Sequence, residues 1–245
     1  MAHELMKEAW IITGGSRGLG LEIAELFHQK GIRVYDLSRS GSGPFHRTCD
    51  ISQPAEAHRV MAKLMEEIFQ ESGWSRIGFI HNAATLGPIS LLEHLDTQDV
   101  KVNIQTNVVS FFSLISNYLS AMNQAAIPGF VVSISSGAAL RGIPGWGLYC
   151  ASKAAGDQLI RVIAQEAGPL ITPIIFDPGI MDTKMQEEIR SQTEEKFPLV
   201  KQFREYKATG KLQNPATVAA KLVALIDGEY GELDRGARYA ARDLG

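Results

Sequence analysis

The sequence predicts an α/β protein built on a doubly wound parallel sheet, and three observations carry this prediction. An apolar segment of strand length, residues 8–13, leads directly into a glycine-rich turn and then into a segment of helical periodicity, residues 21–31. A second strand-like segment, residues 32–38, follows that helix. Further along the chain, strand-like and helical segments keep alternating. This order is typical of parallel strands that are joined by helices.

Length and composition limit the classes of function. The 245 residues suit one sizeable α/β domain, and without a repeat or linker we expect a single domain over residues 1–245. A net charge of −3 without a basic cluster argues against a nucleic-acid partner. No apolar run approaches the ~18 residues that span a bilayer, and the first ten residues lack the apolar core of a signal peptide. We therefore expect a cytoplasmic protein without a membrane partner.

The two cysteines, Cys49 and Cys150, form neither a disulfide framework nor the spacing of metal ligands. We expect both to be reduced, buried and without a metal.

The glycine-rich turn, residues 13–20 (TGGSRGLG), predicts a dinucleotide site. Its glycines let the backbone turn tightly and approach a pyrophosphate, while the N-terminus of the following helix faces the anion. Their spacing differs from G-x-G-x-x-G, so the position between a strand and a helix is what strengthens the prediction.

The end of the second strand bears on the choice of cofactor. Asp36 lies roughly 20 residues past the glycines, where an acid that binds the ribose 2′-hydroxyl is expected. Asp36 is still inside the strand, however, and the strand ends at Ser38 and Arg39. A hydroxyl and a guanidinium suit a 2′-phosphate, and Arg17 offers a second cation. NADP(H) is therefore favoured over NAD(H), unless the two arginines are only solvated loop residues.

The middle of the chain predicts two more strand ends and two helices. Asp50 follows a short third strand and is expected to contact the adenine or to cap the helix of residues 54–70. Residues 76–84 form the next strand and end in Asn82, Ala83 and Ala84, small residues where a ligand crosses such a sheet. We expect His81 to pack within this strand.

A long helix is predicted over residues 96–122, with Asp96 as its N-cap. Asn107 falls within its apolar stripe, so its amide needs hydrogen-bond partners in the core or has a functional role. The predicted stripe consists of Val100, Ile104, Val108, Phe111 and Ile115.

The next strand, residues 129–136, ends at Ser135 and Ser136, and a loop leads to a helix over residues 148–167. Tyr149 and Lys153 lie one turn apart on one face of this helix. An ammonium group there is expected to lower the pKa of the phenol, which makes Tyr149 a candidate general acid or base near neutral pH. Taken alone, Tyr-x-x-x-Lys is common on surface helices.

The C-terminal third begins with a strand over residues 171–179. Residues 180–212 read as two short helices inserted after the carboxyl end of that strand, which predicts a lid over the crevice. A last helix, residues 214–227, starts with Asn214 as cap and Pro215 in its first turn. A short final strand, residues 237–241, is expected to close the sheet.

These features together resemble the short-chain dehydrogenase/reductase family over essentially the whole chain. The matching motifs are, in chain order, Thr13-Gly14-x-x-x-Gly18-x-Gly20, Asp50, Asn82-Ala83-Ala84, Asn107, Ser136, Tyr149-x-x-x-Lys153 and Pro178-Gly179-x-x-x-Thr183. The thirteen-residue gap from Ser136 to Tyr149 is the family's own, and Ala84 replaces its usual glycine. The resemblance implies a doubly wound Rossmann fold of about seven parallel strands, and a homodimer or homotetramer.

The resemblance also implies the site. Ser136, Tyr149, Lys153 and Asn107 would be catalytic, with Asn107 holding a water that links Lys153 to solvent. NADP(H) would be bound by Gly14, Ser16, Arg17, Gly18, Leu19, Gly20, Ser38, Arg39, Asp50, Ile51, Asn82, Ala83, Ala84, Tyr149, Lys153, Pro178, Gly179, Ile180 and Thr183.

Within the family, residues 145–159, 178–186 and 207–215 look most like the sepiapterin reductase and benzil reductase branch. The branch implies NADPH-dependent reduction of a ketone or adjacent dicarbonyl compound to a secondary alcohol. Ala240 stands where sepiapterin reductases carry a pterin-anchoring Asp, with Asp243 nearby, so a diketone is favoured over a pterin. The alternatives are a 3-oxoacyl thioester reductase, another secondary-alcohol dehydrogenase, or a non-catalytic NADP(H)-binding regulator. The expected substrate contacts are Leu140, Trp146 and Met185.

Overall fold

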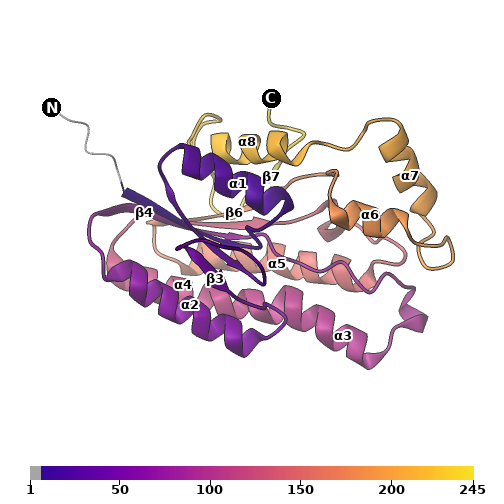
Figure 1. The fold of residues 1–245 in the computed structure, drawn as a ribbon, viewed down its shortest axis with the longest axis horizontal. Helices are drawn as coiled ribbons and strands as arrows, with labels where there is room; N and C mark the ends of the chain where they lie inside the picture. Colours follow the sequence, from indigo (N-terminus) through magenta and orange to yellow (C-terminus); the bar gives the residue numbers. More distant parts are fainter. Residues whose placement is uncertain (1–6) are drawn as a thin grey trace.

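A seven-stranded parallel sheet runs through residues 7–245, the part of the chain that this computed structural model describes (Figure 1). The spatial order is β3-β2-β1-β4-β5-β6-β7, so the chain reverses its direction of winding between β1 and β4. The predicted doubly wound sheet is confirmed, and its ligand crevice is expected at that switch point. The strands are β1 (Lys7–Thr13), β2 (Arg33–Ser38), β3 (His46–Thr48), β4 (Trp74–His81), β5 (Gly129–Ile134), β6 (Ile171–Asp177) and β7 (Arg238–Ala240).

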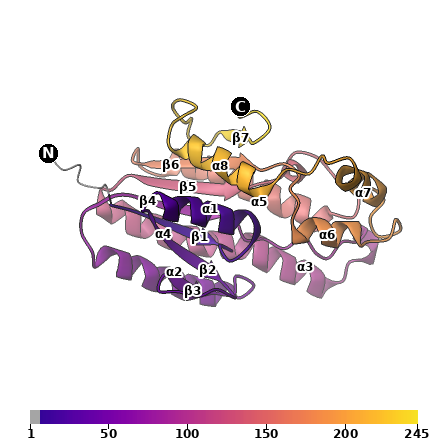
Figure 2. The ribbon, with the colours of Figure 1, turned by 45° about the horizontal axis from the view of Figure 1, so that its top comes forward.

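Helices cover both faces of the sheet (Figures 1 and 2). On one face α1 packs beside α8, and on the other face lie α2, α4 and α5. The helices are α1 (Gly18–Gln29), α2 (Pro54–Phe69), α3 (Thr97–Ile104), α4 (Ser110–Ala125), α5 (Gly147–Glu166), α6 (Lys184–Arg190), α7 (Val200–Ala208) and α8 (Pro215–Ile226).

Two apolar cores follow from the alternation of side chains along the buried strands. In β1, Ala9 and Ile11 point into the core under α2, α4 and α5, whereas Trp10 and Ile12 point toward α1 and α8. The Trp10 ring stacks on Phe27 of α1, with ring centroids 4.8 Å apart. With both faces covered, the ends of the strands are what the sheet offers to a ligand.

The predicted long helix of residues 96–122 is divided by a π-helical turn, Gln105–Val109, between α3 and α4. Asp96 caps α3 as expected, because its carboxylate accepts the N–H of Asp99 at 2.8 Å. The predicted stripe is wrong at its start, since Val100 is 38% exposed whereas Phe111 and Ile115 are buried. A π turn inserts an extra residue and thereby rotates the faces of the two halves relative to each other.

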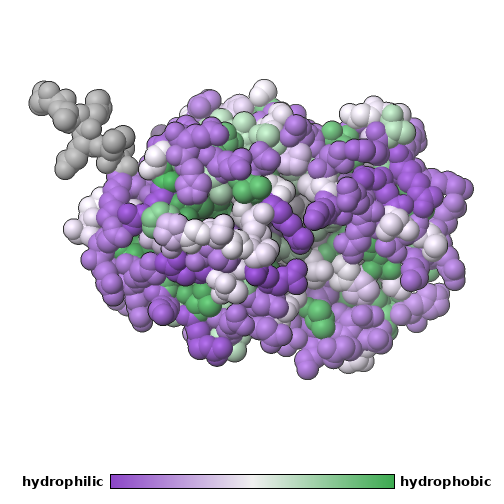
Figure 3. Space-filling model, viewed as in Figure 1, coloured by the Kyte–Doolittle hydropathy of each residue, from purple (hydrophilic) through white to green (hydrophobic). Residues whose placement is uncertain are grey.

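Residues 180–212 contain α6 and α7, which contribute to a third apolar cluster with Trp146 and Tyr149. The short final strand is present as β7, paired in parallel with β6 through Asp177 and Ala240. Figure 3 shows hydrophilic residues over most of one face, with small separate apolar areas. Among residues 7–245, no helix is long and apolar enough to cross a membrane.

Candidate active site

The glycine turn is joined to the end of β4 by neutral hydrogen bonds. The buried Thr13 hydroxyl accepts the backbone N–H groups of Asn82 and Ala83, each at 3.0 Å. The Asn82 amide donates in return to the carbonyls of Thr13 and Gly14, at 3.0 and 3.2 Å. Gly14 has φ +71°, and a Cβ there would lie 3.1 Å from the Ala83 side chain. The close approach of the two loops therefore requires glycine at this position.

The start of α1 fits the pyrophosphate of a dinucleotide. Arg17 occupies the N-cap position without capping the helix through its side chain. The first-turn N–H groups of α1 can therefore bind an anion. Gly18 has φ +55°, and a Cβ there would meet only the Thr183 methyl group at 3.9 Å. Open space thus lies between the glycine turn and the loop after β6, as the predicted cofactor residues require.

Asp36 has a structural role that sequence reasoning missed. Its carboxylate accepts the N–H of Gly15 at 2.7 Å and the Ser38 hydroxyl at 2.6 Å, and it lies 3.0 Å from Nδ1 of His46. Asp36 therefore holds the glycine turn against the end of β2. Arg39, at that end, is exposed, as is Arg17 in the turn.

Asp50 lies in the loop after β3, and the prediction that it caps the following helix is wrong. Its carboxylate accepts the N–H of Ser52 at 2.9 Å, whereas the N-cap position of α2 is Gln53. Asp50 therefore stabilises the turn before the helix and does not cap it. The neighbouring Ile51 carbonyl accepts the hydroxyl of Ser110, which attaches this loop to α4.

Ser136, Tyr149 and Lys153 are brought together at the end of β5. Ser136 follows the strand, and its Oγ accepts the N–H of Ala138 at 3.1 Å. Tyr149 and Lys153 lie on successive turns of α5 and are buried. The Lys153 Nζ donates to the Ile134 carbonyl at 2.7 Å and lies 5.7 Å from the centroid of the Tyr149 ring.

The predicted lowering of the Tyr149 pKa is wrong. Burial raises the pKa of Tyr149 to about 12, with Ser136 opposing the rise and Asp177 adding to it. Burial also lowers the pKa of Lys153 to about 8, although Asp157 and Asp177 oppose this. Desolvation of the phenolate outweighs the ammonium, which is itself bound to a carbonyl. Tyr149 is therefore protonated at neutral pH and can act as a proton donor.

Asn107 lies in the π turn with its amide fully engaged. Its Oδ1 accepts the N–H of Thr85 at 2.8 Å, and its Nδ2 donates to the Thr85 carbonyl at 2.8 Å and to the Ser152 hydroxyl at 3.1 Å. Asn107 therefore ties the loop after β4 to α5 beside Lys153. Its part in holding a water stays a prediction.

A pocket of about 580 Å³ opens beside the first turn of α5. Most of its wall comes from the loop before α5 and from Cys150, whereas sequence reasoning missed the contribution of Leu91, Leu92 and Glu93. Cys150 is half-buried there, so its predicted burial is wrong, whereas Cys49 is buried. The lining residues are Leu91, Leu92, Glu93, Gly142, Ile143, Pro144, Gly145, Gly147 and Cys150.

The expected substrate residues lie in different surroundings. Trp146 is buried, with its ring stacked on Phe197 at 5.0 Å and edge-on to Tyr149 at 5.7 Å. Met185 packs against the same apolar cluster. Leu140 is exposed. Trp146 thus joins the catalytic helix to residues 180–212.

Fold and site together define an oxidoreductase of the dinucleotide-binding class. The family model for short chain dehydrogenases matches residues 8–194. The chain belongs to the short chain dehydrogenase family.

The relatives lie in the branch expected from the motifs. A benzil reductase ((S)-benzoin forming) of Bacillus subtilis is 32% identical over 90% of this chain and 93% of the relative. A sepiapterin reductase of Mus musculus is 35% identical over 72% of this chain and 68% of the relative. A crystal structure of a short chain dehydrogenase/reductase from Saccharomyces cerevisiae has a TM-score of 0.81 at 27% identity, with 96% of each chain covered.

Proposed function

We propose that the protein reduces a ketone or an adjacent dicarbonyl compound to a secondary alcohol with NADPH. The observation that carries this proposal is a buried Tyr149 beside Lys153 and Ser136, at the crevice edge of a doubly wound sheet. The similarity to benzil reductase and sepiapterin reductase supports a substrate with adjacent carbonyls.

The chemistry assigned to the protein's own residues is the handling of one proton. Bound NADPH would supply a hydride to the carbonyl carbon and leave as NADP⁺. Ser136 donates a hydrogen bond to the carbonyl oxygen as negative charge develops there. Tyr149 gives its proton to that oxygen, which completes the alcohol. The Lys153 ammonium then stabilises the phenolate that remains.

The preference for NADPH rests on two cations near the adenosine end of the crevice. Arg17 and Arg39 are both exposed, so each guanidinium is free to approach a 2′-phosphate. The Asp36 carboxylate already accepts hydrogen bonds from Gly15 and Ser38, which leaves it less available to a ribose 2′-hydroxyl.

The pocket beside α5 supports an apolar, uncharged substrate. Its walls are mostly aliphatic, and Glu93 is the acidic residue in its lining. This composition favours a diketone over the phosphate-bearing thioesters of the alternative reading. Asp243 lies after β7 and has a largely exposed carboxylate beside Arg242, which leaves Ala240 without an acidic neighbour in the strand. That favours an aromatic diketone over a pterin.

We further propose that residues 180–212 act as a lid, since α6 and α7 pack against Trp146 at the start of the catalytic helix. Exposed apolar residues, among them Val109 at the end of the π turn, Phe112 on α4 and Val162 on α5, support a homodimer or homotetramer. A cytoplasmic location stays a prediction, supported by two free cysteines.

A substrate panel tests the proposal. Benzil, sepiapterin, a small aliphatic ketone and a 3-oxoacyl thioester are each mixed with enzyme and NADPH or NADH, and the loss of nicotinamide absorbance is followed. The expected result is the highest kcat/KM for the diketone with NADPH. Faster turnover of the thioester, or equal rates with both cofactors, would contradict the corresponding part of the proposal. No turnover of any carbonyl compound would favour the regulator instead.

A further inference from the structure

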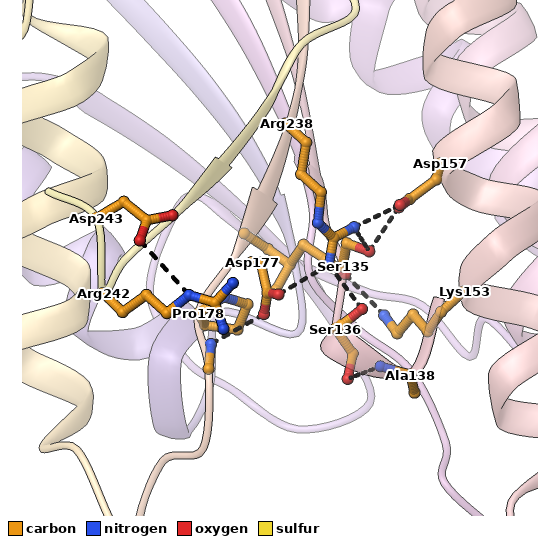
Figure 4. Close-up of polar contacts among 12 residues, drawn as sticks. Ser135, Ser136, Ala138, Lys153, Asp157, Asp177, Pro178, Arg238, Arg242 and Asp243 are labelled. Carbon is orange, nitrogen blue, oxygen red and sulfur yellow. Dashed lines mark hydrogen bonds and ion pairs between the residues drawn. The ribbon is translucent and has the colours of Figure 1, made fainter. Parts of the chain in front are cut away.

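Arg238 extends from the edge strand β7 toward the catalytic end of the crevice, where Figure 4 shows it between two carboxylates. One guanidinium nitrogen donates to the Ser135 hydroxyl at 2.9 Å and to Asp157. The other donates to the Ser136 carbonyl at 2.7 Å and to Asp177 at 2.8 Å. A single side chain therefore binds the end of β5, helix α5 and the end of β6.

Each of these partners lies next to a residue of the site. The Ser136 carbonyl belongs to the residue whose hydroxyl is assigned to the substrate oxygen. Asp157 lies one helical turn after Lys153 on α5. Asp177 accepts the N–H of Gly179 at 3.0 Å through its second oxygen and so shapes the predicted cofactor turn. Arg238 itself touches neither Tyr149 nor Lys153 through any of these bonds.

The charges of the cluster balance only when Arg238 is included. The side chains of Asp157, Asp177 and Arg238 are 3%, 9% and 15% exposed. Two buried carboxylates thus face one guanidinium, and the remaining negative charge is opposed by the Lys153 ammonium. Buried charges of this kind are stable only when they are paired and hydrogen-bonded.

We propose that Arg238 is a positioning residue for carbonyl reduction, which holds the Ser136 strand end, the Tyr149 helix and the Gly179 turn in one arrangement and neutralises one of two carboxylates near Lys153. The inference rests on the proposed function. Arg238 lies on the edge strand and belongs to none of the motifs by which the chain resembles its family.

The groups that face Tyr149 and Lys153 determine the expected direction of a pH effect. They are Cys150 and Asp157 on α5, Asp177 on β6, His81 on β4 and Arg238 on β7. Burial, with Lys153 adding to it, lowers the pKa of His81 to about 3, so His81 is neutral at neutral pH. Asp177 raises the pKa values of both Tyr149 and Lys153. Loss of the Arg238 charge leaves the carboxylates less compensated, so the raised pKa of Tyr149 rises further and the lowered pKa of Lys153 returns toward its ordinary value.

The test compares Arg238→Met with Arg235→Met. Arg235 binds the backbone carbonyls of Ile171 and Ala167, at 3.0 and 2.6 Å, and thus ties the same C-terminal segment to the far end of β6. Arg238→Met is expected to lower kcat by about 10²-fold, the cost of misplaced groups. Its alcohol-oxidation pH profile is expected to move up by about one unit. Arg235→Met should keep the wild-type profile. Equal losses of activity with unchanged profiles in both variants would overturn the proposal.

Two further variants separate charge from geometry. Arg238→Lys keeps the charge but not the forked guanidinium, so we expect the wild-type pH profile with a reduced kcat. Asp177→Asn combined with Arg238→Met removes one charge of each sign and keeps an oxygen for the Gly179 N–H. We expect it to return the profile toward that of the wild type, and a profile that stays at high pH would contradict the charge argument. Arg238→Lys carries the test if circular dichroism shows Arg238→Met to be unfolded.

A spectroscopic titration makes the result independent of substrate. The ultraviolet absorbance of the phenolate is titrated in the wild type and in Arg238→Met, each against the same background with Tyr149→Phe. The difference isolates Tyr149, whose pKa is expected to be higher without Arg238. If the wild type reduces no carbonyl compound, the proposed function fails while this titration still decides on Arg238. An unchanged Tyr149 titration would overturn the electrostatic part.

Discussion

The two ends of the crevice hold their residues in place in different ways. At the glycine turn, Thr13 and Asn82 form neutral hydrogen bonds to backbone groups, and the cations Arg17 and Arg39 remain exposed. At the catalytic end, Lys153 and Arg238 are buried or nearly so, among carboxylates. Exposed charges are screened by salt and easily reoriented, whereas buried charges alter pKa values and hold positions. We therefore expect the phosphate end to respond to salt and the catalytic end to respond to pH.

The largest expected effect is a loss of turnover when Tyr149, at the catalytic end, is changed. Tyr149→Phe removes the proton donor and should lower kcat by at least ~10²-fold, while the dissociation constant for NADPH, measured by fluorescence, stays close to that of the wild type. Tyr230→Phe is the matched control, because that hydroxyl is outside the site and donates to the Gly245 carbonyl at 3.2 Å. Near-normal turnover in Tyr149→Phe would remove Tyr149 from its assigned role.

A change at the glycine turn should lower the free energy of unfolding and should not alter the pH dependence of NADPH binding. Thr13→Val keeps the shape of the side chain but deprives two partly buried N–H groups, those of Asn82 and Ala83, of their acceptor. We expect the free energy of unfolding in urea to fall by about 1–3 kcal/mol. We also expect NADPH binding to weaken by the same factor at about pH 6 and at about pH 9, because no titratable side chain is changed. Thr172→Val on β6, a half-buried strand position, serves as the control. A loss of binding confined to one pH would contradict the neutral character of this end.

The exposed cations allow a smaller, salt-dependent effect. Arg39→Ala removes one guanidinium that is assigned to the 2′-phosphate, so the dissociation constant for NADPH should rise by about tenfold with little change for NADH. The difference should shrink as salt is raised, because exposed charges are screened. Arg242→Ala, at another exposed arginine, is the control. An equal loss for NADPH and NADH would assign Arg39 to something other than the phosphate.

The smallest expected effect concerns Trp146, which packs against residues 180–212. Trp146 Nε1 is buried and has no hydrogen-bond partner within residues 7–245, whereas Trp74 Nε1 donates to the Ile68 carbonyl at 2.9 Å. Trp146→Phe should therefore lose ring packing but no hydrogen bond, and lower the free energy of unfolding less than the same change at Trp74 does. Trp74→Phe leaves the Ile68 carbonyl without its donor, so it should lower the free energy of unfolding by about 1 kcal/mol more than Trp146→Phe does. The reverse order in urea unfolding would indicate that the Trp146 N–H has a partner in solution.

Local patterns were sufficient for much of the site. The glycine turn, the Ser136 to Tyr149 spacing and the Tyr149 to Lys153 pair were all recognised because each depends on residues close in the chain. The parallel, doubly wound sheet was predicted from the alternation of strands and helices, and the presence of β7 from a short segment at residues 237–241, whereas the order of the strands came from the structure. The predicted helix of residues 96–122 was correct in extent but not in its faces, since periodicity cannot reveal a π turn.

The contacts of Asp36 and Arg238 show what local patterns miss. Asp36 was considered as a ribose ligand, yet it binds Gly15, which lies 21 residues earlier in the chain. Arg238 belongs to none of the sequence motifs, although it binds partners 61 to 103 residues away. The Tyr149 pKa was predicted in the wrong direction because the proximity of Lys153 can be read from spacing, whereas the burial of the phenol cannot.

By itself, the sequence determined the family of this protein, its doubly wound sheet and the residues that meet at the crevice, because those depend on short-range spacing and on the order of strands. Only the tertiary structure decided which charges are buried together, that burial raises the Tyr149 pKa, and that the edge strand reaches the catalytic end through Arg238. The physical reason is that desolvation and ion pairing depend on distances in space, and residues far apart in the chain come within hydrogen-bond reach only after the sheet has formed.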